Sequence, residues 1–426
     1  MKTTKHNITN TAEPIKPGYK KTPVGVIPED WEVKKLDNIF EFKNGVNGDK
    51  SKYGEGIKFI NVMEVIYNNR ITSNMISGSI MIPERQKNLF LVKKGDVLFN
   101  RTSETQDEIA LAALYDDEEE VVFGGFVIRG RPKKNILINN FKKYCFDSSM
   151  MRKQIISKGQ GAIRFNIGQS DLRKVNLPIP PLPEQEAIAD CLSTWDKGIE
   201  KLSALIAAKK EQKKGLMQGL FSGELKVENG QLIQAKDGED FTKEWKEVKL
   251  GEIAYCLDNL RVPLNSEERD KMKGEIPYCG ANGVIDYVND FVIDDDIILM
   301  AEDGGYFDEY ETRPIAYRMK GKCWVNNHAH ILKAKENFNH SFLFYSLVHK
   351  NVIPYISGGT RAKLNQKHLL QIKINAPVDS EEQTAIAEIL QTADKEIELL
   401  EKKLEAFKTQ KKGLMQVLLT GEKRLV

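Results

Sequence analysis

Two stretches of the chain carry apolar residues at a regular spacing of alternately four and three positions. One stretch covers 188–220 and the other covers 386–418. Three lysines interrupt the pattern at seam positions: Lys209, Lys213 and Lys411. A 3.5-residue period that is sustained over several heptads is typical of a coiled-coil seam. The pattern therefore predicts two long helices, over 182–223 and 380–422, that pair along their length.

The two predicted helices are copies of one sequence. Residues 184–224 and 382–422 are identical at 24 of 41 positions when they are shifted by 198 residues, and the shared residues include the whole run QKKGLMQ. Weaker similarity continues upstream, where WEVKKLDNIF from Trp31 matches WKEVKLGEIA from Trp245. The chain is therefore a unit of roughly 200 residues that is used twice, an internal pseudo-two-fold repeat.

The connection after the first helix fixes the direction of the second. Residues 224–240 form a short polar linker, so the second body begins near the end of the first helix. The second helix must then run back along the first, and the pair is antiparallel. An apolar stripe of about 37 residues extends roughly 55 Å at about 1.5 Å per residue, which predicts a rod with one globular domain at each end. The alternative is that each helix packs only on its own domain.

The remaining residues form two bodies, 25–181 and 241–379, preceded by an N-terminal arm over 1–24. Short apolar runs bounded by turn residues predict strands at 57–65, 96–101 and 121–130, and at 297–302, 314–319 and 323–334. Helices are expected at 141–159 and 340–350. The fold class is therefore mixed α/β, with two domains of short strands and helices joined by an antiparallel coiled coil.

Composition narrows the possible functions. The net charge is only +2 and 41% of the residues are apolar. If the chain binds DNA, its positive charge must be clustered or partner subunits must supply part of it. The five cysteines lie far apart in the sequence, which favours reduced thiols over a disulfide framework or a zinc site. Without an apolar run long enough to span a membrane, we expect a soluble, cytoplasmic protein.

Polar residues at predicted strand ends and in glycine-rich loops are candidates for DNA contact. Arginine suits bidentate readout of guanine, asparagine suits adenine, and lysine, serine and threonine suit phosphate. The predicted contact residues are Arg101, Thr102, Ser103, Arg129, Arg131, Lys133, Lys134, Arg164, Asn326, Asn327 and Arg361. Each of them could instead be an ordinary solvated or turn residue. His328 and His330 suggest a metal only weakly, because strand alternation explains their spacing, and we expect none.

The chain carries a series of motifs whose order resembles that of the specificity subunit of type I restriction–modification systems. The resemblance covers nearly the full length and rests on GVIPEDWEVKKL, GDVLFNRTS, GGFVIRGRP, PIPPLPEQEAIA and the duplicated QKKGLMQ. In the second body the first motif is degenerate, FTKEWKEVKL, and the proline junction becomes NAPVDSEEQ. The resemblance implies that each body is a target-recognition domain for one half of a bipartite DNA sequence. Since the two bodies differ in sequence, the half-sites should differ as well.

The same resemblance implies a set of partners. The paired helices would act as a spacer and would dock two copies of the modification methyltransferase subunit, which uses S-adenosylmethionine to methylate adenine. Restriction subunits, which use ATP and Mg²⁺, would join the assembly. The chain itself has no phosphate-loop, dinucleotide or zinc-protease motif, so we expect a non-catalytic subunit without a cofactor of its own.

Three alternatives remain open. One is a nuclease or fused methyltransferase whose motif is unfamiliar. Another is a structural adaptor whose coil spaces two protein-binding domains. The last keeps the DNA-binding function but places it in a system that only methylates.

Overall fold

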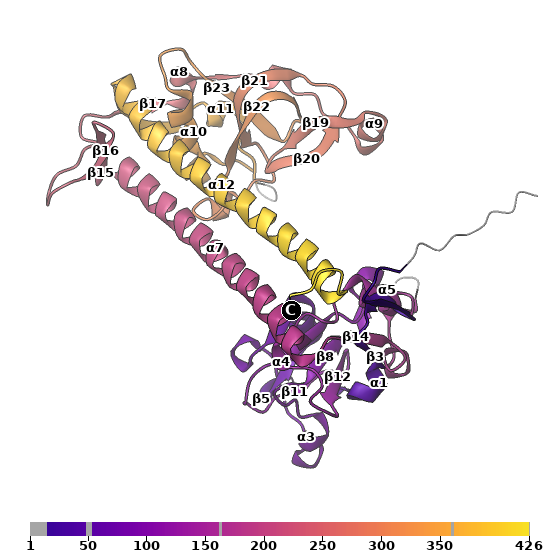
Figure 1. The fold of residues 1–426 in the computed structure, drawn as a ribbon. Helices are drawn as coiled ribbons and strands as arrows, with labels where there is room; N and C mark the ends of the chain where they lie inside the picture. Colours follow the sequence, from indigo (N-terminus) through magenta and orange to yellow (C-terminus); the bar gives the residue numbers. More distant parts are fainter. Residues whose placement is uncertain (1–14, 48–52, 162–163, 359–361, 426) are drawn as a thin grey trace, which may run out of the picture. The chain divides into compact units, whose positions relative to one another are not determined.

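The structure, a computed structural model, describes residues 15–47, 53–161, 164–358 and 362–425. The chain divides into two compact units (Figure 1). Unit 1 consists of Met1–Lys201 with Leu404–Val426, and unit 2 is Leu202–Lys403. The boundary crosses both long helices, so each unit contains one body together with part of each helix.

Unit 1 contains a five-stranded sheet in the order β4-β12-β8-β10-β6. Its strands are β4 (Phe40–Asn44), β6 (Arg70–Ile71), β8 (Val97–Asn100), β10 (Ala112–Tyr115) and β12 (Val127–Pro132). A three-stranded sheet combines β5 (Tyr53–Ile60), β7 (Ser79–Ile80) and β11 (Val122–Phe123). The two-stranded pairs are β1 (Tyr19–Thr22) with β2 (Gly25–Pro28), β3 (Glu32–Lys35) with β14 (Asn176–Ile179), and β9 (Thr102–Ser103) with β13 (Phe165–Asn166). The short helices are α1 (Leu36–Ile39), α2 (Val62–Tyr67), α3 (Glu84–Phe90), α4 (Asn139–Lys142), α5 (Ser149–Ile156) and α6 (Gln169–Leu172).

Three predicted elements of unit 1 are wrong in detail. The strand expected over 121–130 is interrupted by a turn at 124–126, so that β11 and β12 belong to different sheets. The strand expected over 57–65 ends at Ile60, the last residue of β5. Helix α2 follows, because Asn61 and Glu64 form a capping box that starts a helix. The helix expected over 141–159 is divided into α4 and α5. The Ser148 hydroxyl accepts a hydrogen bond from the backbone N–H of Met151 at 3.3 Å, so a new helix begins there.

Unit 2 contains a six-stranded sheet in the order β18-β23-β21-β22-β19-β20. Its strands are β18 (Ala254–Cys256), β19 (Lys273–Gly280), β20 (Gly283–Val288), β21 (Ile293–Ala301), β22 (Ala316–Val325) and β23 (Ala329–Ala334). Its short helices are α8 (Leu250–Ile253), α9 (Ser266–Lys271), α10 (His340–Val348) and α11 (Gln366–Leu369). The strand expected over 323–334 is interrupted by a turn at 326–328. The expected polar linker forms a hairpin of β15 (Leu225–Glu228) and β16 (Gln231–Gln234), and β17 (Lys246–Lys249) pairs with β24 (Lys373–Ala376).

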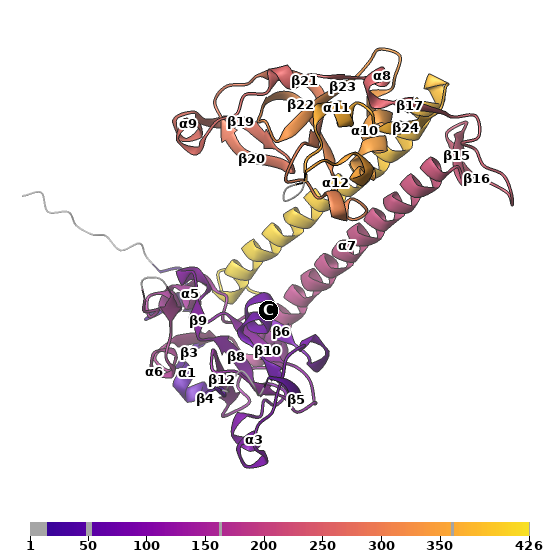
Figure 2. The ribbon, with the colours of Figure 1, turned by 180° about the vertical axis from the view of Figure 1, so that it is seen from behind.

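The long helices are α7 (Leu182–Ser222, 41 residues) and α12 (Ser380–Leu419, 40 residues). Within unit 1, the rings of Trp195 and Phe407 lie 5.5 Å apart, and Leu192 shares a core cluster with Leu418. Residue numbers rise along one helix as they fall along the other, so the helices are antiparallel there (Figures 1 and 2).

Unit 2 repeats this antiparallel pairing. Lys209 of α7 contacts Glu396 of α12 at 2.8 Å, and Lys210 contacts Glu401 at 2.6 Å. The predicted antiparallel coiled coil is confirmed. The alternative is wrong, because the end of α12 packs into the core of the first body, beside α5.

Two further features concern the cysteines and the apolar length of the helices. All five cysteines are free thiols. None of the helices in the described part of the chain is long and apolar enough to cross a membrane.

Candidate nucleic-acid interface

Three segments of unit 1 meet where β8 ends. The backbone N–H of Arg101 donates to the carbonyl of Phe126 at 2.8 Å, and the carbonyl of Arg101 accepts from the N–H of Ile167 at 3.0 Å. Next to them β9 pairs with β13 in antiparallel register. The strand end 101–103, the turn 124–126 and residues 160–161 and 164–166 therefore form one structure, which we call the strand-end cluster of unit 1.

Unit 2 builds the same cluster from different residues. The N–H of Glu302 donates to the carbonyl of His328 at 2.8 Å, and the carbonyl of Glu302 accepts from the N–H of Leu364 at 2.7 Å. The turn 326–328 thus corresponds to 124–126, and Glu302 takes the place of Arg101. The bridge between Ser357 and Lys363 likewise corresponds to the bridge between Gln160 and Asn166. The backbone is duplicated while the side chains have diverged.

A cavity of about 500 Å³ opens at the cluster of unit 1, and predicted residues line it. They are Thr102, Ser103 and Arg164. Exposed apolar side chains stand beside them, notably Tyr67 at 74% and Phe126 at 58% exposure. Neither residue is among those predicted from the sequence, although an aromatic residue in the glycine-rich run GGFVIRG is a signal for Phe126.

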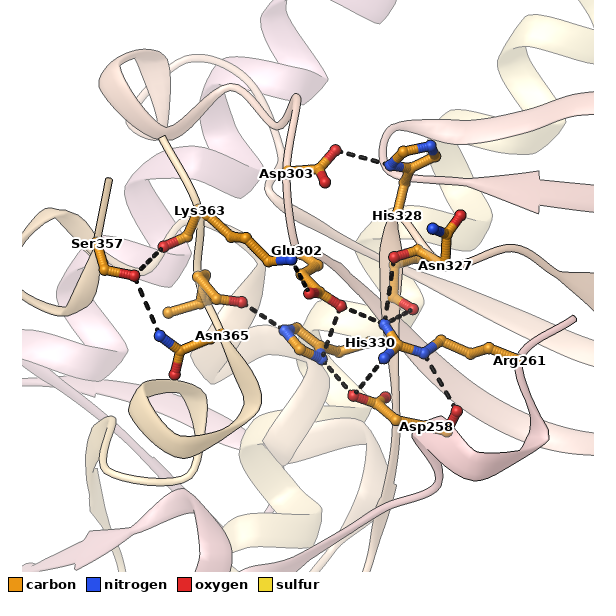
Figure 3. Close-up of polar contacts among 12 residues, drawn as sticks. Asp258, Arg261, Glu302, Asp303, Asn327, His328, His330, Ser357, Lys363 and Asn365 are labelled. Atoms are coloured by element: carbon orange, nitrogen blue, oxygen red, sulfur yellow. Dashed lines mark hydrogen bonds and ion pairs between the residues drawn. The ribbon is translucent and has the colours of Figure 1, made fainter. Parts of the chain in front are cut away.

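The cluster of unit 2 is held by a network of charges (Figure 3). Glu302 is paired with Arg261 and, at 2.8 Å, with Lys363. Burial raises the pKa of the Glu302 carboxyl, but the hydrogen bonds from Lys363 and Arg261 outweigh burial and leave its pKa below the ordinary value. His330 is fully buried, with Nδ1 at 2.6 Å from Asp258 and Nε2 at 2.6 Å from the carbonyl of Leu364. These contacts tie the loop that contains Lys363 to the strand end.

One group in the described part of the chain resembles a metal site. Ligand atoms of Cys256, Asp258 and His330 lie within 4.8 Å of one another. Both ring nitrogens of His330 already face oxygen atoms, and the Arg261 guanidinium lies 3.2 Å from the Asp258 carboxylate. Because a cationic side chain already occupies this carboxylate, the residues fit an ion-pair network better than a metal site.

Two members of the predicted basic cluster, Arg129 and Arg131, lie within β12 and are held by contacts inside the domain, which corrects our expectation for them. Arg129 is 3% exposed, and its guanidinium donates to the carbonyl of Leu91. Arg131 makes a forked contact with Asp96, at 3.0 and 2.7 Å. The sequence could not show this, because Asp96 lies 35 residues before Arg131. The neighbours Lys133 and Lys134 are exposed, and Lys133 donates to the carbonyl of Asp37 at 2.6 Å.

The other candidates have mixed environments. Asn326 is 5% exposed, and its side-chain oxygen accepts from the N–H of His328 at 2.9 Å, so it closes the turn instead of facing DNA. Asn327 is exposed at the tip of this turn. In unit 1, Ser103 is 7% exposed and donates to Glu108 at 3.2 Å. Arg361 lies outside the described residues.

The same scaffold is used twice in this chain, with matching strand-end clusters and unlike side chains. The chain belongs to the family of type I restriction modification DNA specificity domains, which matches residues 28–209 and 242–409. It is accordingly a DNA-recognising specificity subunit, the non-catalytic targeting part of a restriction–modification complex.

Individual relatives extend this similarity over the whole chain. A protein of Methanocaldococcus jannaschii, assigned as the MjaX specificity subunit of a type I restriction enzyme, is 28% identical over 426 residues, which is 96% of this chain and 97% of the relative. The EcoKI specificity subunit of Escherichia coli is 25% identical over 59% of this chain and 53% of its own length. The crystal structure of the S subunit from M. genitalium covers 91% of this chain and 96% of its own, with a TM-score of 0.54 and 19% identity.

Proposed function

We propose that each body reads one half of a bipartite, asymmetric DNA target, and that the coiled coil sets the spacing and docks two copies of a methyltransferase subunit. The observation that carries this proposal is the duplicated strand-end cluster. Arg101 and Glu302 occupy equivalent backbone positions, and so do Phe126 and His328. A shared backbone presents side chains to DNA in the same geometry, while unlike side chains select unlike bases.

The charges at the two clusters support unlike half-sites. Arg101 adds a positive charge to the cluster of unit 1, whereas the Glu302 carboxylate in unit 2 is neutralised by Arg261 and Lys363. With a net charge of only +2, much of the phosphate contact would come from partner subunits. Those partners would also hold S-adenosylmethionine, and ATP with Mg²⁺ where a restriction subunit is present.

The duplicated run QKKGLMQ supports docking along the helices. Gly215 and Gly413 lie at its centre, and a Cβ at either position would meet nothing within 4 Å. A glycine inside a helix costs about 1 kcal/mol relative to alanine, and packing within the chain gives no reason for it here. Close approach of another backbone would give such a reason, and both copies of the helix keep the residue.

Selection from random duplexes tests the proposal. The chain would be mixed with its methyltransferase subunit, and bound DNA would be sequenced at several salt concentrations. We expect two short, different sequences at a fixed separation, and affinity that falls steeply with salt. Binding without sequence preference and without a salt response would support the adaptor instead. Cleavage by the purified chain alone with Mg²⁺ would support a nuclease.

A further inference from the structure

The turn before β12 displays an exposed aromatic side chain, Phe126. The N–H of Val127 closes the turn on the carbonyl of Gly124 at 2.9 Å. A Cβ on Gly125 would lie 1.7 Å from the side-chain oxygen of Asn47, and one on Gly45 would lie 2.1 Å from the carbonyl of Gly124. There is therefore little room for a side chain at Gly45 or Gly125, while the Phe126 ring of the turn remains 58% exposed. Met63 and Tyr67 are also exposed and line the same cavity, so the three side chains form a contiguous apolar patch of the kind that marks a binding site.

The surroundings of Phe126 suit a base better than a phosphate. The cavity beside the ring is lined by apolar Met63 and Tyr67, by the Arg164 guanidinium and the Thr102 hydroxyl, and by the carboxylates of Glu104 and Glu108. Two carboxylates repel phosphate, but they accept hydrogen bonds from the amino groups of cytosine and adenine. Arginine and threonine supply donors, and the apolar side chains offer contact to a base face or a thymine methyl.

The equivalent turn in unit 2 presents a ring of different chemistry. The carbonyls of Phe126 and His328 accept the same backbone hydrogen bond, from Arg101 and Glu302 respectively. The Nδ1 atom of His328 lies 2.7 Å from Asp303 (Figure 3), which leaves Nε2 as the remaining hydrogen-bonding atom of the ring. One position in the duplicated scaffold is therefore apolar in the first body and polar in the second.

We propose that this turn position determines specificity in both bodies: Phe126 makes an apolar contact with a base of the first half-site, and His328 makes a hydrogen bond to a base of the second. The inference rests on the proposed DNA-reading function and names residues that perform it. Arg164 and Thr102 would orient the base edge beside Phe126.

The test uses the complex with the methyltransferase subunit and the target found by mapping methylated adenines in cells that carry the gene. Binding to the target and to every single-base variant would be measured for Phe126→Ala, Phe126→Leu and His328→Ala. Leu89→Ala is the matched control, because Leu89 is also an exposed apolar residue of unit 1, at 49%, and does not line the cavity.

We expect Phe126→Ala to lower discrimination about ten-fold at one or two adjacent base pairs of a single half-site. Discrimination in the other half-site and the salt dependence should stay unchanged, because no phosphate contact is lost. Phe126→Leu should retain part of the discrimination that Phe126→Ala loses. Leu89→Ala should leave discrimination unchanged, and His328→Ala should lower it in the opposite half-site.

Three outcomes would overturn the inference. Full discrimination by Phe126→Ala would show that the ring touches no base, while the proposed function would stand. A uniform loss of binding to all sequences, shared by Phe126→Leu, would assign the ring to general affinity. Effects of Phe126→Ala and His328→Ala on the same half-site would contradict the equivalence of the two turns. Failure of the proposed function is distinct, since the unsubstituted complex would then select no bipartite target.

Discussion

Lys213 on α7 is paired with Asp394 on α12 at a position of the coiled-coil seam where the pattern expects an apolar residue. The Asp394 carboxylate also accepts the Tyr345 hydroxyl at 2.6 Å. Unit 1 repeats the arrangement with Lys411, Asp196 and Tyr144. The lysines that interrupt the seam therefore bind the opposite helix and anchor each body to the coil.

Removing this pairing should destabilise unit 2 by a modest amount. Both Lys213→Met and Asp394→Asn should cost about 1 kcal/mol, and a double-mutant cycle from urea unfolding should give a coupling energy of about 0.5–1 kcal/mol. The lysine side chain is 20% exposed and the aspartate 42%, so water screens part of the attraction. Lys402→Met, which removes an exposed pair with Glu398 on one helix, is the control and should change little. Additive effects of Lys213→Met and Asp394→Asn would contradict the account.

The buried carboxylate of Glu184 in unit 1 should contribute more to the free energy of unfolding than its counterpart Glu382 in unit 2. Glu184 is fully buried, accepts the indole N–H of Trp31 at 2.8 Å and pairs with Arg424. Its counterpart Glu382 accepts the indole of Trp245 at 3.1 Å and is only partly buried. Glu184→Ala should cost about 3 kcal/mol of unfolding free energy, because it leaves the Trp31 indole N–H without an acceptor and removes one of the two carboxylates that pair with Arg424. Glu382→Ala should cost about 1 kcal/mol. Equal losses in urea unfolding would contradict this difference.

The network at Glu302 predicts acid sensitivity of unit 2. Burial acts to raise the pKa of Asp258 and of Glu302, but their hydrogen bonds leave both values below the ordinary 3.8 and 4.5. As the pH falls through these values the unfolded chain takes up protons first, so the free energy of unfolding decreases with acidification. Glu302→Gln should reduce this pH dependence and lower stability near neutral pH.

Urea unfolding of unit 2 between pH 7 and pH 3 would check this prediction. Glu275→Gln changes an exposed carboxyl of the same unit and is the matched control. An unchanged pH profile for Glu302→Gln would show that the network does not stabilise the loop.

The helix glycines predict opposite effects on folding and on assembly. Gly215→Ala and Gly413→Ala should each stabilise the isolated chain by up to about 1 kcal/mol, because alanine favours a helix and a Cβ there meets nothing. The same substitutions should weaken binding of the methyltransferase subunit, as measured by calorimetry. Unchanged methyltransferase binding by both variants would remove the glycines from the docking surface.

The sequence predicted the coiled coil well because a 3.5-residue period directly reports which face of a helix is buried. Among its predicted contact residues, Thr102 and Arg164 line the cavity of the strand-end cluster of unit 1, because strand ends and glycine loops leave local signals. It could not show that Arg129 is buried, since that depends on packing against Leu91 from a distant segment. It also missed the turn within 323–334, where apolar residues on both sides of 326–328 resemble one continuous strand.

The equivalence of the two strand-end clusters was also hidden in the sequence. The offset between copies is 197 residues from Asn166 to Lys363, but 201 from Arg101 to Glu302. Because the loops differ in length between the two copies, the constant sequence offset that reveals the helix repeat does not hold in the bodies. Only the backbone hydrogen bonds show that Arg101 and Glu302 occupy the same place.

Exchange of one body tests whether the two bodies read their half-sites independently. Residues 31–180 would be replaced by the corresponding segment of a relative with a different target, and methylated adenines would be mapped across the genome. The account predicts a new sequence in one half of the methylated motif, with the other half and the spacing unchanged because unit 2 and the helices are untouched. A simultaneous change in both halves would contradict it.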